Sequence, residues 1–165
     1  MAITLLALAA AGTLALIASI AVGYQVPAAV AHLKAHFLLG LLSTTLLVMA
    51  HSFIMFFLIA TGVEMKDMEK ERGWGDSFRR RSIRLKSLSF PAMTFALLLV
   101  LVNFILGAAA HTHALPARVH EATAWLTLLT CLFALQREWL VLGENNRLIE
   151  EAALRQKDTA SPKRG

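Results

Sequence analysis

Four stretches of the sequence are almost free of charge, and each is long enough to cross a lipid bilayer as a helix. They lie at about 3–23, 37–62, 90–110 and 120–142. A spanning helix needs about 20 mostly apolar residues. The first and third stretches contain no ionisable residue, the second contains only His51, and the fourth is uncharged over 122–136. Because an isolated strand cannot satisfy its backbone in lipid, the sequence predicts an all-α fold, a four-helix transmembrane bundle forming a single domain over 1–165.

The composition agrees with burial in lipid. Hydrophobic residues make up 57% of the chain and charged residues 16%, whereas soluble domains carry about 25% charged residues. The first stretch lacks the basic segment of a signal peptide, and its apolar run is longer than the usual 7–15 residues. We therefore expect it to be a retained first helix.

The basic residues are concentrated in two segments. Fourteen of the sixteen Lys and Arg residues lie between residues 63 and 89 or from Arg137 onward. In a four-span chain these segments share one side of the membrane, which the positive-inside rule assigns to the cytoplasm. We expect both termini inside, a cytoplasmic basic loop at 63–89, and short outer loops at 24–36 and 111–119. The net charge of +5 then reflects topology, and we expect no nucleic-acid partner.

The segment after the fourth span, residues 143–165, mixes charges with an apolar pattern of helical period. This pattern predicts that helix four continues into the cytoplasm as a helical C-terminal extension, and we expect Thr159–Gly165 to fray. The basic run Arg79–Lys86 is typical of a topology determinant that contacts anionic lipids. Contact with an acidic partner subunit is the alternative.

Each predicted helix carries a stripe of small or polar residues. Small residues let another helix approach closely, and polar residues on a spanning helix should face the bundle interior. The stripe of helix one predicts packing and no chemistry, whereas each of the other three includes histidine. In chain order the stripes are Ala7, Ala11, Ala15, Ser19 and Gly23; His36, Gly40, Ser43, His51 and Met55; Asn103, Gly107 and His111; and His120, Thr127, Cys131 and Glu138.

Five of the six histidines are predicted to lie at the outer side of the membrane, because they begin, end or connect the spans there. His51 is the exception, about 22 Å deeper than His36 along the same helix. This asymmetry is the strongest chemical signal in the sequence. The five outer residues are His32, His36, His111, His113 and His120.

Neutral imidazole is a common ligand for haem iron, copper and zinc. A four-helix bundle can hold haem b between two histidines on facing helices, and His36 with His111 or His120 would form such an axial pair. Gly40 and Gly107 would leave space beside the macrocycle.

His51 is too deep to serve that haem. It would bind a second haem with Met55 or Met93, or hydrogen-bond to a neighbouring helix. A buried ionisable residue is costly in lipid unless it is satisfied. We therefore expect His51 to be functional or interhelical.

A copper or zinc site from His111, His113 and His120, with His36 as a further ligand, is the second metal hypothesis. The two residues of the His-Thr-His sequence can share a metal only on an extended loop. A structural cluster of histidines without any cofactor also stays open.

The overall plan resembles the small four-helix cytochrome b-type membrane subunits of bacterial respiratory oxidoreductases. His36, His51, His111 and His120 on inward faces carry this resemblance, over about 110 of the 165 residues. In that family the histidines bind haem b and pass electrons between a redox partner and quinone. The resemblance implies a location in the bacterial inner membrane.

These observations predict a small integral subunit of a respiratory or redox complex, without catalytic activity of its own. It would transfer electrons through haem b or a metal and associate with other membrane-protein subunits. The alternative is a cofactor-free accessory or scaffold subunit that stabilises a larger complex by helix packing.

Overall fold

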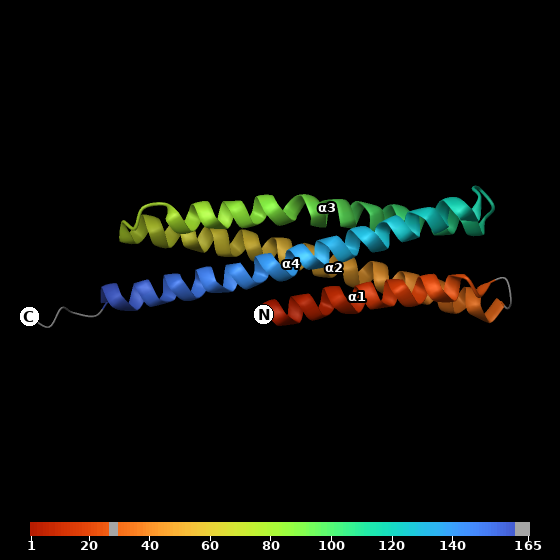
Figure 1. Ribbon diagram of the computed structural model, residues 1–165, viewed down its shortest axis with the longest axis horizontal. Coiled ribbons are helices and arrows are strands. Elements are labelled where there is room, and N and C mark those ends of the chain that lie inside the picture. Colours follow the sequence, from red (N-terminus) through yellow and green to blue (C-terminus); the bar gives the residue numbers. More distant parts are fainter. Residues whose placement is uncertain (27–29, 161–165) are drawn as a thin grey trace, which may run out of the picture.

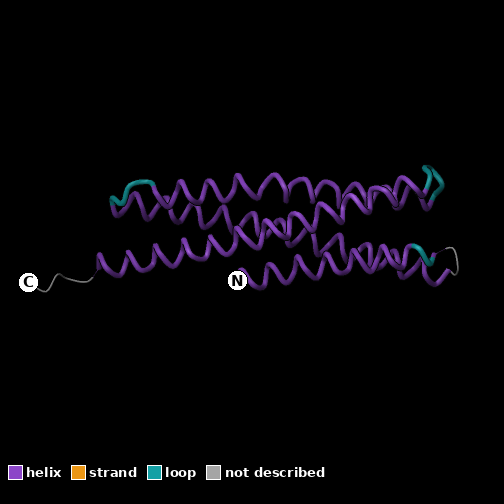
Figure 2. The backbone as a smooth tube through the Cα atoms, viewed as in Figure 1, coloured by secondary structure: helices purple, strands orange, loops and turns teal. Residues whose placement is uncertain are grey.

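The computed structural model describes residues 1–26 and 30–160, and in this part of the chain all regular structure is helical. Four long helices run alternately up and down (Figures 1 and 2). All four are long and apolar enough to cross a membrane, which confirms the predicted all-helical, multi-pass architecture. The helices are α1 Ala2–Gly23, α2 Val30–Arg72, α3 Ser77–His111 and α4 Ala117–Ala160.

The prediction of a loop at 63–89 is wrong, because nearly all of this segment is helical. Only residues 73–76 separate α2 from α3. Gly73 ends α2 with φ of 65°, and the Trp74 amide donates to the Glu69 carbonyl at 3.1 Å, as in a Schellman motif. The Glu69 carboxylate then accepts hydrogen bonds from the amides of Phe78 (2.6 Å) and Arg79 (3.3 Å). A buried acid at the positive end of α3 stabilises this sharp turn.

The predicted outer loop at 24–36 is likewise shorter than expected, since α2 begins at Val30. The predicted continuation of helix four is confirmed as a single helix to Ala160. Thr159 is therefore helical, and the rest of the segment predicted to fray, residues 161–165, lies outside the described residues.

The bundle has two chemically different ends. Figure 1 shows that α1 begins about midway along the bundle, so one end is built from α2, α3 and α4 alone. We call this the charged end (residues 63–89 and 143–160). It has its own small core of Met65, Phe78, Leu148 and Ala152. The opposite end, where α1 meets α2 and α3 meets α4, is the histidine end (residues 19–26, 30–36 and 103–123).

Ion pairs join α3 to α4 at the charged end. Arg81 donates to Glu144 at 2.8 Å and to both carboxylate oxygens of Glu151. The hydrogen bonds from Glu151 and Glu144 raise the pKa of Arg81, and the Arg81 guanidinium lowers the pKa of Glu151. A carboxyl whose pKa is lowered in the folded state stabilises it at neutral pH and loses that contribution as the pH falls.

The predicted small-residue stripe of helix one is partly wrong. Ala7 and Ala11 are exposed, whereas the buried face comprises Ala9, Gly12, Thr13, Leu16 and Ser19. Strict steps of four rotate about 40° per step around a helix, so five such positions cannot share one face. Gly12 marks the true contact, because a Cβ there would lie 2.9 Å from Cγ of Leu47.

The polar stripes of the other helices are largely confirmed. They turn inward along most of their length, and only the end of the α3 stripe, His111, is exposed. The buried members are Ser43, His51, Asn103, Thr127, Cys131 and Glu138.

Candidate functional site

His36 lies near the start of α2 and is held against α1. Its Nδ1 is 2.8 Å from the carbonyl oxygen of Ser19, and the Ser19 hydroxyl donates to the His36 carbonyl at 3.2 Å. Gly23 makes this approach possible, since a Cβ there would lie 3.0 Å from Cε1 of the ring. A carbonyl can only accept, so Nδ1 carries the proton and Nε2 keeps its lone pair. This second contact orients histidine ligands in metal sites.

His120 occupies the first turn of α4 and is held against α3. A Cβ on Gly107 would lie 3.0 Å from Cε1 of the His120 ring. The Nδ1 atom of His120 is buried and has no hydrogen-bond partner among the described residues. Just below it, Thr123 donates to the Asn103 side-chain oxygen at 3.0 Å. Thr123 therefore satisfies the side-chain oxygen of Asn103, and Nδ1 of His120 stays without a partner.

The rings of His36 and His120 meet in a T-shaped contact between α2 and α4. Their centroids are 6.0 Å apart and their planes are inclined by 74°. With metal–nitrogen bonds of about 2 Å, two imidazoles that share one metal ion have ring centres roughly 5 to 6.5 Å apart. The pair thus has the separation that a shared metal requires.

The other outer histidines are not part of this pair. The side chains of His111 and His113 are exposed, at the end of α3 and on the following turn. His113 has φ of 59°, and the amide of Ala114 donates to the Ala109 carbonyl at 2.9 Å. His113 therefore takes the left-handed position that ends a helix. His32 is bonded through Nδ1 to the Gln25 carbonyl at 2.8 Å.

The structure separates the candidate ligands of the copper or zinc site into two groups. It brings His36 and His120 together, and the exposed His111 and His113 lie outside this contact. Within residues 1–26 and 30–160, no group of three or more His, Cys, Asp or Glu side chains is placed to hold a metal ion. The metal site with His111 and His113 stays a prediction.

His51 hydrogen-bonds to a neighbouring helix, which is the second of the two arrangements expected for it. Its Nδ1 hydrogen-bonds Oε1 of Glu138 on α4. The side chains are 1% and 0% exposed, and Nε2 of His51 and Oε2 of Glu138 have no further partner among the described residues. A second haem at this depth through Met55 or Met93 stays a prediction.

Sequence reasoning named both members of this buried contact but did not pair them. His51 and Glu138 were each placed on an inward face, and their partnership depends on how α2 and α4 are packed. Sequence reasoning missed one polar contact altogether. Tyr24 donates to Glu121 at 2.5 Å and accepts from Trp125 at 3.0 Å, which ties the end of α1 to α4. Aromatic residues close to a span boundary were the available signal.

Comparison with known proteins gives no relative: no family model, no curated protein and no solved structure matches this chain.

The buried pair should behave as a unit in a double-mutant cycle. Replacing His51 alone with Leu leaves Glu138 buried without its partner, and we expect a loss of about 3 kcal/mol or more of folding free energy. The double variant His51→Leu, Glu138→Leu should recover most of that loss, because two apolar side chains suit the surrounding core. The free energy of unfolding in detergent micelles is measured for the wild type, the two single variants and the double variant. Glu150→Leu, at an exposed position of α4, is the control, and additive effects would contradict the coupling.

Proposed function

We propose that this chain is a small integral subunit of a redox complex in the bacterial inner membrane, with a haem b held by His36 and His120. One observation carries the proposal: imidazoles from two helices lie next to each other with their ring centroids 6.0 Å apart. The contact between His36 and the Ser19 carbonyl supports it, because it leaves Nε2 of His36 as the free ligand atom.

A pair of imidazoles suits haem better than a bare ion. The porphyrin supplies four nitrogen ligands, so the protein needs to add only the two axial ones. A structural zinc ion needs four ligands, usually all from the protein. Bound haem would supply one-electron chemistry at the histidine end of the bundle.

The surrounding residues have defined tasks in this proposal. Ser19 fixes the tautomer of His36, and Gly23 and Gly107 let the two imidazoles lie close to α1 and α3. The Thr123 hydroxyl satisfies the side-chain oxygen of Asn103 beside the pair. Together these contacts would hold the two imidazoles in a fixed orientation.

The orientation follows from the charge distribution. The charged end contains most of the basic residues, and we propose that it lies in the cytoplasm. The histidine pair then lies near the outer face. An electron carrier at that depth would exchange electrons with a partner subunit at the outer half of the membrane.

Topology reporters test this orientation. Fusions after Gly165 and within the turn at 73–76 should report the cytoplasm, and an insertion beside Pro116 should report the periplasm. The opposite pattern at any of the three positions would contradict the proposed orientation, and with it the outer position of the histidine pair.

Ligand variants test the proposed haem site. The purified wild-type protein should show a Soret band and reducible α and β bands. His36→Ala or His120→Ala should abolish these bands while the protein still inserts, because insertion depends on apolar span length. Visible absorption spectra of the oxidised and reduced protein measure this.

Two matched variants serve as controls for these spectra. His111→Ala removes an exposed imidazole from the same end, and His113→Gly removes another while keeping the backbone conformation at φ of 59°. Both should retain the full spectrum. Loss of haem in His111→Ala, with retention of haem in His120→Ala, would show that His111 and not His120 is the axial ligand. A wild-type protein without haem in its native complex would leave the cofactor-free accessory subunit as the function.

A further inference from the structure

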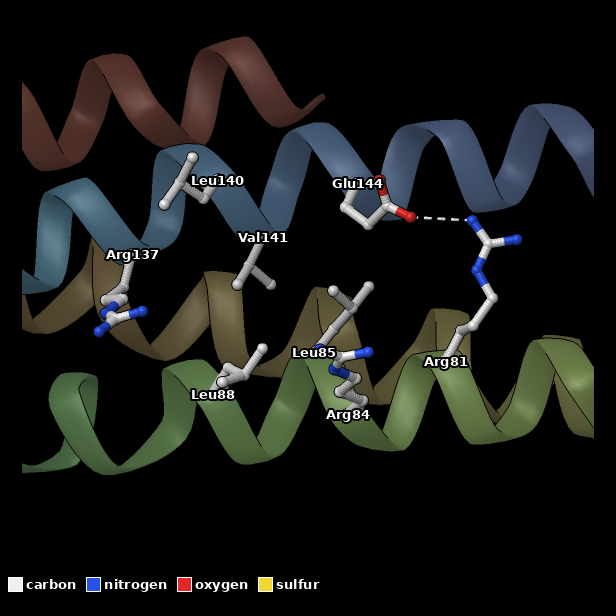
Figure 3. A pocket seen from close by; sticks show the side chains of 8 residues that line it. All are labelled: Arg81, Arg84, Leu85, Leu88, Arg137, Leu140, Val141 and Glu144. Atoms are coloured by element: carbon white, nitrogen blue, oxygen red, sulfur yellow. Dashed lines mark hydrogen bonds and ion pairs between the residues drawn. The ribbon is translucent and has the colours of Figure 1, made fainter.

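A groove runs between α3 and α4 where the apolar bundle meets the charged end. It has a volume of about 340 Å³. Figure 3 shows apolar side chains along the middle of the groove, with Arg137 toward one end and Arg81 and Arg84 toward the other. The apolar residues are Leu85 and Leu88 of α3 and Leu140 and Val141 of α4.

The depth of the groove is set by the core beneath it. Leu85 and Val141 belong to the same buried cluster as Ala2, the first residue of α1. The groove therefore lies level with the start of α1, the helix without charged residues. Beyond this level α3 and α4 continue into the charged end. In a membrane protein such a boundary meets the lipid headgroups.

The charges around the groove are unbalanced. Arg81 is already paired with Glu144 and Glu151. Within the part of the chain that the structure describes, neither Arg84 nor Arg137 has a carboxylate within ion-pair distance. The Arg137 guanidinium lies 5.0 Å from the centroid of the Phe133 ring, and Arg84 is exposed. An arginine beside an apolar membrane surface is costly without an anion.

We propose that this groove binds one anionic phospholipid, with its phosphate held by Arg84 on the side of the charged end and an acyl chain lying on the leucines. Guanidinium groups bind phosphate through paired, charge-assisted hydrogen bonds. The apolar side chains of the groove offer no hydrogen bond to a free phosphate. They can pack against an acyl chain of a bound phospholipid. Lipid is also the solvent at this boundary, so it reaches the groove at high concentration. The site is independent of the haem proposal.

A lipid-binding measurement tests this site. The full-length protein is purified in neutral detergent, depleted of lipid and titrated with phosphatidylglycerol or with phosphatidylcholine of the same chains. Native mass spectrometry counts bound lipids. We expect one tightly held phosphatidylglycerol per chain and much weaker phosphatidylcholine binding. Replacing Arg84 with Gln should weaken phosphatidylglycerol binding about fivefold, given the usual contribution of one interfacial arginine.

The control must remove the same charge outside the groove. Arg79 lies at an exposed position of α3 and does not line the groove, so Arg79→Gln should change phosphatidylglycerol binding little. Equal losses in the two variants would overturn the proposal in favour of diffuse attraction. Displacement of the lipid by inorganic phosphate would indicate a simple anion site. Cross-linking of Arg84 to an acidic partner helix in native membranes would make the groove a subunit interface and would also overturn it.

Discussion

The whole bundle is built around a carboxylate and an imidazole that lipid cannot solvate. Glu138 and His51 must meet inside the bundle, and this contact fixes how α2 and α4 are rotated about their axes. His120 precedes Glu138 by about five helical turns, and His36 precedes His51 by about four. The rotation that buries one pair therefore also brings the imidazoles of His36 and His120 together at the histidine end. The paired histidines at one end depend on a constraint about 22 Å away.

Two boundaries divide the molecule along its length. At the charged end, α2, α3 and α4 continue past α1 and enclose a small separate core. There Arg81 joins α3 to α4 through two carboxylates, which suits an aqueous environment. At the histidine end, Tyr24 joins α1 to α4 through Glu121. The apolar length between these polar contacts is the part suited to lipid, and the α3–α4 groove lies at its limit nearer the charged end.

The sequence predicted the helices and most of their inward faces, because hydrophobic length and polar stripes are local properties. Ser43, His51, Thr127 and Glu138 were all placed correctly by spacing. The face of α1 was not, because an alanine-rich helix offers small residues in several directions. Gly12 against Leu47 chooses among them, and that choice depends on a second helix.

The residues that contact the histidines could not be predicted from the sequence pattern either. His111 and His120 were equivalent as candidates beside His36, and only packing separates them. His113 was a candidate ligand of the alternative metal site, and its backbone ends α3 in the left-handed conformation, which its sequence did not predict. The predicted basic loop was mistaken for a loop because charged residues dominate it. Its apolar residues, such as Met65 and Phe78, face a core that needs α4 to complete it.

The central claim is that His36 and His120 are the two axial ligands of one haem iron. The low-temperature electron paramagnetic resonance spectrum of the oxidised protein, purified in its native complex, tests it most directly. The account predicts a low-spin ferric signal typical of two imidazole ligands, which disappears in His120→Ala. A high-spin ferric signal, a low-spin signal that survives His120→Ala, or a preparation without haem would contradict it.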